Sequence, residues 1–564
     1  MIELDQIRIP CGEIPGKQIE NQIRHILHLK RSVRFSWTIV RHSVDCRKKP
    51  DLYDVYTVDI VFKDISEDEE RQIVEQIDTQ KLKGHHIRNV QADPYLFPAG
   101  KEDAPRLSHR PVVVGFGPCG IFCSLMLAQE GYCPIVLERG QKMEQRLKTV
   151  NQFFSDGVLN PESNIQFGEG GAGTFSDGKL NSGIRDSQGR TKEVLRILVE
   201  AGAPKEILSE QIPHVGTDLL RGIVCTLRNK LCSLGGEIHF ESKVTDLILQ
   251  DGVVKGVRYL DGKEEKELET DVVVLCIGHS ARDTMQTLYQ KGVLMEPKAF
   301  AVGFRVSHPQ ALIDEARYGI RDPDRKKQLH LPPSSYKLTA KAKDGKGVYS
   351  FCMCPGGYVV NASSEVGGLV VNGMSNYKRN SPRANSAIVV TVQEEDCRRE
   401  LSSNNEFSED KNPFACMRFQ QKLERNAFAL ANGKVPVQRF TSFQKEKVDS
   451  SIPSSKELCV LGDCAPGALH DLLPRPFTED FLYGMQKFGH EIKGFTGDEC
   501  YVIGLESRTS SPVRILRDEQ GEAKIKGLYP AGEGAGYAGG ILSSAVDGIR
   551  AAERIASRYQ PKLE

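Results

Sequence analysis

The chain has 564 residues, and its 75 Lys and Arg residues balance its 75 Asp and Glu residues, so the formal net charge at pH 7 is zero. No bulk field therefore draws it to nucleic acid or to an anionic bilayer, although local patches remain possible. The length allows about three or four domains. We predict a small N-terminal α+β domain (1–100), a nucleotide-binding domain in two parts (108–295 and 501–564), and an inserted domain (296–500).

The first hundred residues have the pattern of a separate unit. Alternating apolar residues predict strands at 2–9, 33–47 and 52–62, and helices are expected at 17–29 and 66–79. This order is that of a ferredoxin-like split βαβ unit. Basic residues gather between Lys30 and Lys49. We favour a solvated face over RNA binding here, because no aromatic stacking motif accompanies the charges.

Targeting signals and cysteine usage indicate the compartment. The N-terminal sequence MIELDQIRIP is charged where a signal peptide would be apolar, and no run approaches the roughly 18 apolar residues of a membrane helix. We therefore expect a cytoplasmic protein without membrane partners. The 15 cysteines suit free thiols in a reducing compartment. For Cys352 and Cys354, in FCMCPGG, we favour packing over a redox or metal pair, and we expect no metal site.

A strand-turn-helix-strand unit follows a Pro-, Gly- and charge-rich linker at 97–111. Residues 111–140 are PVVVGFGPCGIFCSLMLAQEGYCPIVLERG, in which a short strand leads into G-x-G-x-x-G and a helix. The first glycine allows a tight turn, the second lets a pyrophosphate approach, and the third lets helix and strand pack. An acid about 20 residues later accepts hydrogen bonds from a ribose diol. These features predict a dinucleotide site at Gly115, Gly117, Pro118, Cys119, Gly120, Glu138 and Arg139.

Two later segments are expected beside the same site. The loop FGEGGAGTFSDGKL (167–180) is rich in glycine, as expected where backbone approaches a ligand closely, and its candidates are Gly170, Gly171, Gly173 and Thr174. In DVVVLCIGHSARD (271–283), a buried strand returns to the nucleotide sheet and ends near Gly278. The following His279 could serve the ligand or be a hydrogen-bonded structural residue, and both possibilities stay open.

The long segment 298–495 contains many alternating apolar runs. It predicts a mainly β domain with some helix, including 414–430. Arg305, His308, Arg379 and Arg383 are candidates to grip an anionic substrate there. Ordinary surface or ion-paired roles are the alternative for isolated arginines.

The strand-loop-helix pattern returns near the end of the chain. In GLYPAGEGAGYAGGILSSAVDGIRAA (527–552), a strand at 528–530 precedes a glycine-rich turn, and a helix begins at Ile541. This unit can close the same sheet as the fingerprint. Its candidate binding residues are Gly532, Glu533, Gly539, Gly540 and Ile541.

These motifs, with SDGKL, CMCPGG and SRTSSPVRI, carry a resemblance over nearly the whole chain. It resembles FAD-dependent oxidoreductases of the two-dinucleotide-fold (glutathione-reductase-like) superfamily, in particular bacterial FAD-dependent dehydrogenases of unknown substrate with a small N-terminal domain. The resemblance implies an α/β fold with a Rossmann-like FAD-binding domain and an inserted substrate domain. It places the FAD pyrophosphate at the fingerprint glycines, the adenosine ribose at Glu138 and the ribityl chain at Glu533. The helix opened by Gly539 and Gly540 would point its positive end at the flavin.

A second dinucleotide fingerprint is missing. VLGDCAPGA (460–468) lacks the pattern, so NAD(P)H, a possible electron donor, would need a less familiar site. The absence of a C-x4-C centre beside the fingerprint argues against disulfide-reductase chemistry.

We therefore expect an FAD-dependent dehydrogenase that transfers a hydride between a small-molecule substrate and flavin N5. Catalytic candidates, from their places on predicted flavin-facing loops, are Lys179, His279, Arg508 and Ser510. Arg305 and Arg379 are the substrate candidates. Two alternatives stay open: a tRNA-associated flavoprotein that docks through its basic N-terminal domain, and a non-catalytic, flavin-holding interaction protein. The sequence leaves the substrate, the electron acceptor and the oligomeric state unassigned.

Overall fold

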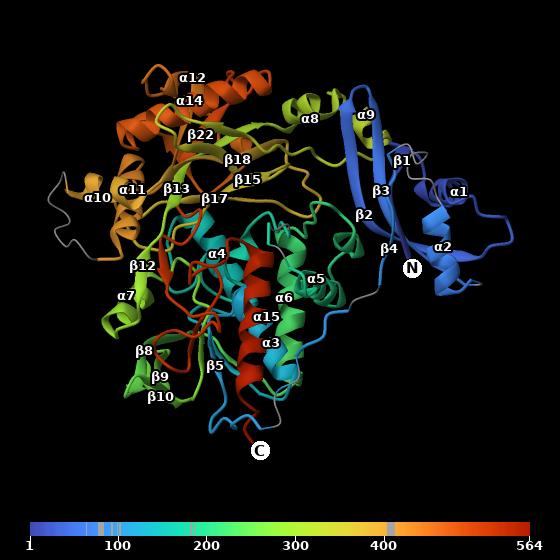
Figure 1. Ribbon diagram of the computed structural model, residues 1–564. Helices are drawn as coiled ribbons and strands as arrows, with labels where there is room; N and C mark the ends of the chain where they lie inside the picture. The colour runs from blue at the N-terminus through green and yellow to red at the C-terminus, as the bar shows by residue number, and fades with distance from the viewer. Residues whose placement is uncertain are drawn as a thin grey trace.

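The computed structural model describes residues 1–63, 65–76, 84–91, 94–98, 100, 103–180, 183–184, 186–402 and 412–563. It is a mixed α/β protein containing a parallel sheet, as expected (Figure 1). The blue N-terminal sheet lies at one side of the molecule, and helices α3 and α15 lie side by side although the chain separates them widely. Within the described ranges, no helix is both long and apolar enough to cross a membrane.

The N-terminal sheet has the strand order β2-β3-β1-β4, with every neighbouring pair antiparallel. A split βαβ unit places its strands in this order. Alternate apolar side chains of β1 and β3 form its core against α1, with Ile2, Leu4 and Ile60 fully buried. The last residues expected in the second helix, 77–79, lie outside the described residues. The elements are β1 Ile2–Pro10, α1 Pro15–Ile26, β2 Phe35–Lys48, β3 Asp51–Phe62, α2 Glu67–Gln76 and β4 Ile87–Asn89.

The central sheet is parallel and brings distant segments together. Its order is β24-β11-β5-β6-β7, so the predicted strands at 112–114, 271–278 and 528–530 are neighbours. Both faces are covered, which explains their continuous apolar runs. Val113 packs toward the helices, whereas Val112 and Val114 pack toward the sheet β10-β9-β8. The strands are β5 Val112–Val114, β6 Ile135–Leu137, β7 Glu237–His239, β8 Ser242–Gln250, β9 Val253–Asp261, β10 Glu264–Glu269, β11 Val273–Leu275 and β24 Leu528–Pro530.

Helices of this region connect its strands. Gly548 allows α15 to lie against α3, because a Cβ there would be 2.2 Å from the Cys119 carbonyl oxygen. The helices are α3 Pro118–Gln129, α4 Met143–Asp156, η1 Gly171–Phe175, α5 Arg190–Glu200, η2 Lys205–Leu208, α6 Thr217–Ser233, α7 Arg282–Gln290 and α15 Ile541–Arg558. A two-stranded ribbon, β12 Met295–Pro297 with β23 Val513–Ile515, leads into and out of the remaining sheets.

A seven-stranded sheet, β14-β15-β18-β13-β22-β19-β21, dominates the segment after residue 298. Strand β22, Tyr501–Glu506, lies between β13 and β19, so this sheet continues past the boundary expected at 500. No Pro- or Gly-rich linker marks that position in the sequence. The other strands are β13 Phe300–Pro309, β14 Thr339–Lys341, β15 Gly347–Cys354, β18 Arg383–Val392, β19 Val435–Arg439 and β21 Cys464–Pro466.

A small sheet and several helices complete this region. The small sheet has the order β17-β16-β20, with β16 Tyr358–Asn361, β17 Val371–Met374 and β20 Val460–Leu461. Aromatic residues of α14, including Phe477 and Phe481, pack in the core of the large sheet. The helices are α8 Gln310–Tyr318, α9 Pro323–Gln328, α10 Glu394–Ser402, α11 Ala415–Leu430, α12 Phe440–Phe443, α13 Ser455–Leu458, η3 Leu469–Asp471 and α14 Arg475–Glu491.

Candidate functional site

The fingerprint turn between β5 and α3 requires glycine at two positions for steric reasons. Gly115 has φ +98°, and a Cβ there would lie 2.5 Å from the Cys276 carbonyl oxygen. A Cβ on Gly120 would lie 1.9 Å from the Gly115 carbonyl oxygen. Gly117 differs, because an added Cβ would meet only Gly171 Cα, at 3.8 Å. At the start of α3, only the Gly171 backbone therefore lies beside Gly117.

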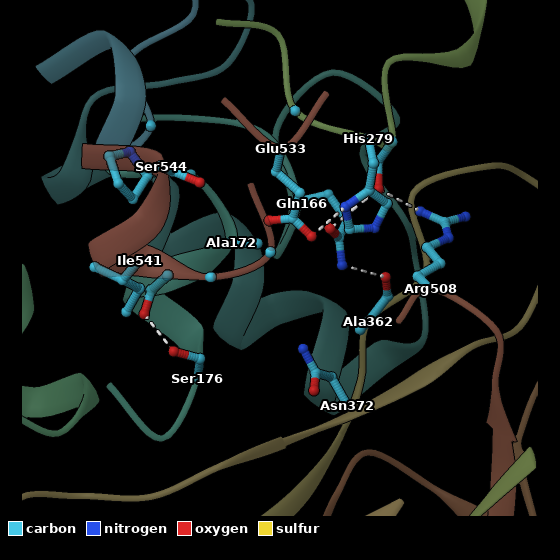
Figure 2. A pocket seen from close by; sticks show the side chains of 18 of the residues that line it. Gln166, Ala172, Ser176, His279, Ala362, Asn372, Arg508, Glu533, Ile541 and Ser544 are labelled. Carbon is cyan, nitrogen blue, oxygen red and sulfur yellow. Dashed lines mark hydrogen bonds and ion pairs between the residues drawn. The ribbon is translucent and has the colours of Figure 1, made fainter. Parts of the chain in front are cut away.

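The N-termini of α3 and α15 open onto the same cavity. No side chain among the described residues caps either helix, so their first backbone N–H groups are available to an anion. At the start of α15, a Cβ on Gly539 would meet nothing within 4 Å. Pro118 and Cys119 of α3 line the cavity. Ile541 and Ser544 of α15 line it as well (Figure 2). The cavity has a volume of about 770 Å³.

Glu138, at the end of β6, lines the cavity but is only 5% exposed. Its carboxylate accepts hydrogen bonds from the N–H groups of Phe116 (2.8 Å), Gly140 (2.9 Å) and Gly168 (2.9 Å). One side chain thus ties the fingerprint turn to the two loops that follow it. The contact expected between Glu138 and an adenosine ribose stays a prediction.

Arg139 gives the same end of the cavity a charged surface. Its guanidinium lies 4.0 Å from the centroid of the Phe167 ring and forms ion pairs with Glu162 (2.7 Å) and Asp283 (3.0 Å). Lys243, also on the wall, pairs with the same two carboxylates. The planar groups of this network suit an aromatic base at the cavity end.

The glycine-rich loop passes between the two helix N-termini. Gly171 and Gly173 line the cavity, whereas Gly170 and Thr174 do not. A Cβ added to Gly171 would lie 3.1 Å from Gly117 Cα. A Cβ added to Gly173 would lie 3.1 Å from Ile541 Cγ1. The small residues therefore let the loop approach both helices closely.

Arg146, which the sequence analysis did not identify, holds this loop from behind. Its side chain is fully buried and donates to the carbonyl oxygens of Asn164, Ile165 and Glu169, at 2.6 to 2.9 Å. Burial lowers the pKa of Arg146 to about 9. Its position on an ordinary polar helix gave no signal, because the loop carbonyls that it binds converge only in the fold.

His279 and Glu533 form a pair on the cavity wall. Nδ1 of His279 lies 3.0 Å from a carboxylate oxygen of Glu533, and both residues line the cavity, as does Gly278 (Figure 2). Nε2 of His279 is buried and has no hydrogen-bond partner among the residues that the structure describes. Gly532 does not line the cavity, and its N–H donates to Asp547 at 2.8 Å.

The four catalytic candidates divide into three groups. Lys179 and His279 line the cavity; Lys179 donates to the Met353 carbonyl oxygen and lies 3.6 Å from Asp177. Arg508 also lines it, but its guanidinium is held by Glu424 at 2.8 Å in a buried cluster. Ser510 does not line it.

The buried cluster around Glu424 joins the large sheet to the nucleotide-binding region. Glu424 pairs with Arg282 at 2.8 Å as well as with Arg508. Burial alone would raise the pKa of Glu424, but the two arginines hold it well below its usual range. Arg508 also donates to the hydroxyls of Ser280 (3.1 Å) and Ser364 (2.5 Å). These contacts hold the Arg508 side chain in place in the cavity wall.

The two substrate candidates lie behind the wall instead of on it. Arg305 is 0% exposed and donates to Glu506 (2.9 Å), Asn385 (2.9 Å) and Asn372 (3.0 Å). Arg379 pairs with Asp177 at 2.6 Å. Neither arginine lines the cavity, whereas their partners Glu506, Asn372 and Asp177 do. Isolated arginines in the sequence gave no indication of these partners, which come from other strands and loops.

His308 and Arg383 are also interior residues. His308 is fully buried, its Nε2 lies 2.7 Å from the Phe495 carbonyl oxygen, and burial lowers its pKa to about 4. Arg383 bonds to Ser307 at 2.8 Å. Neither lines the cavity.

Cys352 and Cys354 lie on β15 beside the cavity. Cys352 lines it with φ +67°, and Cys354 is buried behind it. Both thiols are free, and burial raises the pKa of Cys354 to about 12. A buried thiol of this kind is a weak nucleophile.

The comparisons with known proteins address the whole chain. Residues 299–509 match the family model described as FAD-dependent protein, C-terminal domain-like. An uncharacterised protein from Clostridium beijerinckii is 41% identical over 553 residues, which cover 96% of this chain and 96% of that protein. The chain is thus an FAD-dependent protein. It belongs to one family with the Clostridium protein, and both the expected cofactor, FAD, and the resemblance stated from the sequence are confirmed.

Solved structures show weaker likenesses. A glycerol-3-phosphate dehydrogenase from Bacillus halodurans, complexed with FAD, is 12% identical, with 79% of this chain and 63% of that chain covered at a TM-score of 0.33. A geranylgeranyl bacteriochlorophyll reductase-like protein from Thermoplasma acidophilum is 12% identical, with 79% and 78% covered at a TM-score of 0.34. We draw no conclusion about this chain from likenesses of this size.

The residues around the cavity fit FAD. The two uncapped helix N-termini offer backbone N–H groups to phosphate. Gly278 and Gly539 have nothing within 4 Å of an added Cβ, and an added Cβ at Gly117 would contact only Gly171 Cα at 3.8 Å. These glycines leave backbone exposed where side chains would fill the cavity. The volume of about 770 Å³ lies in the upper part of the range of roughly 300–1,000 Å³ for ligand sites.

Proposed function

We propose that this chain is an FAD-dependent oxidoreductase that transfers a hydride between a small-molecule substrate and the flavin. One observation carries the proposal: the cavity that both helix N-termini enter is also lined by the seven-stranded sheet, at residues 350–353. A site for the cofactor alone would not need this second wall. When bound, the flavin supplies the redox chemistry, and the protein supplies orientation and electrostatics.

The residues of the cavity wall would have separate roles in binding the cofactor and the substrate. The α3 N-terminus and Gly117 would hold the pyrophosphate, and the α15 N-terminus would place positive potential beside negative charge on the flavin. Glu533 would use one carboxylate oxygen for His279 and offer the other to the ribityl chain. We assign substrate binding to the inserted region, whose large sheet extends to residue 506.

His279 is our choice for the proton-handling residue. A carboxylate at 3.0 Å favours the tautomer with its proton on Nδ1, which leaves the lone pair on Nε2. Nε2 is buried and has no partner within the described part of the chain, so it would accept a proton from the substrate once the ring turns toward the cavity. Lys179 would fix the glycine-rich loop against β15 through the Met353 carbonyl.

The test begins with the purified protein. Its cofactor is released, identified by mass and quantified against protein. The holoprotein is then mixed anaerobically with NADH, NADPH and a panel of metabolites while flavin absorbance is followed. Rapid bleaching by a metabolite supports the proposal. Bound flavin that no reductant in the panel reduces faster than free FAD contradicts it and favours a flavin-holding protein.

A further inference from the structure

Part of the cavity lies away from the fingerprint, between the glycine-rich loop and the large sheet. We call it the outer compartment. Its wall combines an aromatic side with polar groups, and Ile212, itself 50% exposed, lies at its edge. The residues that define it are Lys179, Ile212, Arg317, Tyr336, Lys337, Phe351 and Cys352.

The acidic residues next to the outer compartment are already neutralised from behind. Asp177 is 2% exposed and binds Arg379 at 2.6 Å, with a second hydrogen bond from Ser375. Burial alone would raise the pKa of Asp177, but Lys179 and Arg379 hold it below its usual value. Glu506 is likewise 2% exposed and paired with Arg305 at 2.9 Å.

Two of the three basic residues of the outer compartment lack such partners. Arg317, from α8, and Lys337, before β14, are both exposed. Neither forms an ion pair or a side-chain hydrogen bond with any residue that the structure describes. Lys179 shares its one carboxylate, Asp177, with Arg379. The outer compartment therefore carries a net positive charge in a concave, partly apolar setting, where the field on a small ligand is focused.

We propose that the outer compartment binds the oxyanion group of the substrate, a carboxylate or a phosphate, through Arg317 and Lys337, while Tyr336 and Phe351 contact its less polar part. Both oxyanions match the guanidinium fork and the ammonium point charge. The proposal rests on the proposed function, because it names the substrate class of that same site. It also moves anion recognition from the interior Arg305 and Arg379 to two exposed residues of the wall.

The experiment uses the FAD-loaded full chain and two readouts, isothermal titration calorimetry and the flavin difference spectrum. The anionic probes are benzoate, succinate and inorganic phosphate, and benzamide and succinamide are the neutral counterparts of the two carboxylates. We expect at least one anion to bind, and its affinity to fall as the sodium chloride concentration is raised. A carboxylate that binds should have a higher affinity than its amide. Comparison of carboxylates with phosphate separates the two sources of the oxyanion.

Paired variants locate the binding. The Arg317→Ala/Lys337→Ala double variant is expected to weaken anion binding roughly tenfold. The Arg321→Ala/Lys343→Ala double variant removes the same charge from exposed positions that do not line the cavity, and should bind as the unmodified protein does. Equal binding of amides and anions, unchanged binding by the first double variant, or no anion binding would each overturn the proposal. Anion binding without flavin reduction by any metabolite would instead count against the proposed function.

Discussion

Nδ1 of His42 lies 2.8 Å from a carboxylate oxygen of Glu210 and fastens the N-terminal sheet to the segment beside the cavity. Two backbone hydrogen bonds reinforce the contact: His42 N–H donates to Ser209 at 2.7 Å, and Gln211 N–H donates to His42 at 3.0 Å. The next residue, Ile212, lines the cavity. The N-terminal sheet thus supports a wall of the site from outside.

This contact predicts a pH dependence of stability. Asp54, Glu210 and the stacked Tyr56 face His42. Burial alone would lower the pKa of His42, but hydrogen bonds to Asp54 and Glu210 raise it from 6.5 to about 9. A raised folded-state pKa gives stability that is complete below the unfolded value and is lost as pH rises through the folded value.

We therefore expect His42→Gln to lower the free energy of unfolding by about 2 kcal/mol at pH 6. The difference from the unmodified protein should shrink as pH rises from 6.5 to about 9. Denaturant unfolding across this pH range measures it. His25→Gln, at an exposed position, is the control. A difference that stays constant over the range would show that the ion pair is not its source.

Two glycines of the fingerprint should respond differently to substitution. Gly120→Ala places a Cβ 1.9 Å from the Gly115 carbonyl oxygen, so we expect a loss of about 3 kcal/mol in stability or failure to fold. Gly117→Val places its Cβ in ordinary contact with Gly171 Cα, at 3.8 Å, and should destabilise the cofactor-free protein less than Gly120→Ala does. FAD should then be lost from Gly117→Val.

The ratio of FAD to protein and the thermal midpoint of the apoprotein measure the two effects separately. Gly222→Ala, at an exposed position of α6 with nothing within 4 Å of its added Cβ, is the matched control. Full FAD occupancy in Gly117→Val would show that the pyrophosphate does not bind at the α3 N-terminus.

The buried ion cluster behind the cavity wall predicts a large effect on stability. Glu424→Gln leaves Arg282 and Arg508 without their shared carboxylate, and removing one partner of a buried ion pair costs about 3 to 5 kcal/mol. Chemical denaturation of the variant measures this cost. Glu395→Gln, on an exposed position of α10, should change stability by less than about 0.5 kcal/mol. Similar values for the two variants would mean that the cluster contributes little.

The proposed role of His279 predicts a kinetic effect with unchanged cofactor binding. His279→Asn should retain FAD and slow substrate-dependent flavin reduction by about 10²- to 10⁴-fold. Glu533→Gln should also slow flavin reduction, because the carboxylate at 3.0 Å orients the imidazole. Stopped-flow absorbance measures both. His239→Asn, with 43% of its side chain exposed, serves as control. An unchanged rate of flavin reduction in His279→Asn would show that another residue accepts the proton from the substrate.

Local steric requirements made much of the cofactor site predictable. Gly115 and Gly120 are fixed by contacts within a few residues of the turn or with an adjacent strand, so they leave a short motif in the sequence. The buried strands at 112–114, 273–275 and 528–530 appear as apolar runs because both faces of a parallel sheet are covered. The helix that begins at Ile541 was also predictable, because a run of glycines precedes it in the sequence.

Tertiary structure alone decided which charged residues reach the cavity. The sequence shows Arg305, Arg317 and Arg379 as similar isolated arginines. In the fold, β13 stands beside β22 and gives Arg305 a buried partner, Glu506, whereas Arg317 lies exposed at the mouth of the cavity. An ion pair between distant residues depends on strand order and on which side chains share a face, and neither quantity has a local signature in the chain. The motif therefore predicts where FAD binds, and the packing of one sheet against another determined which charged residues lie beside that cavity.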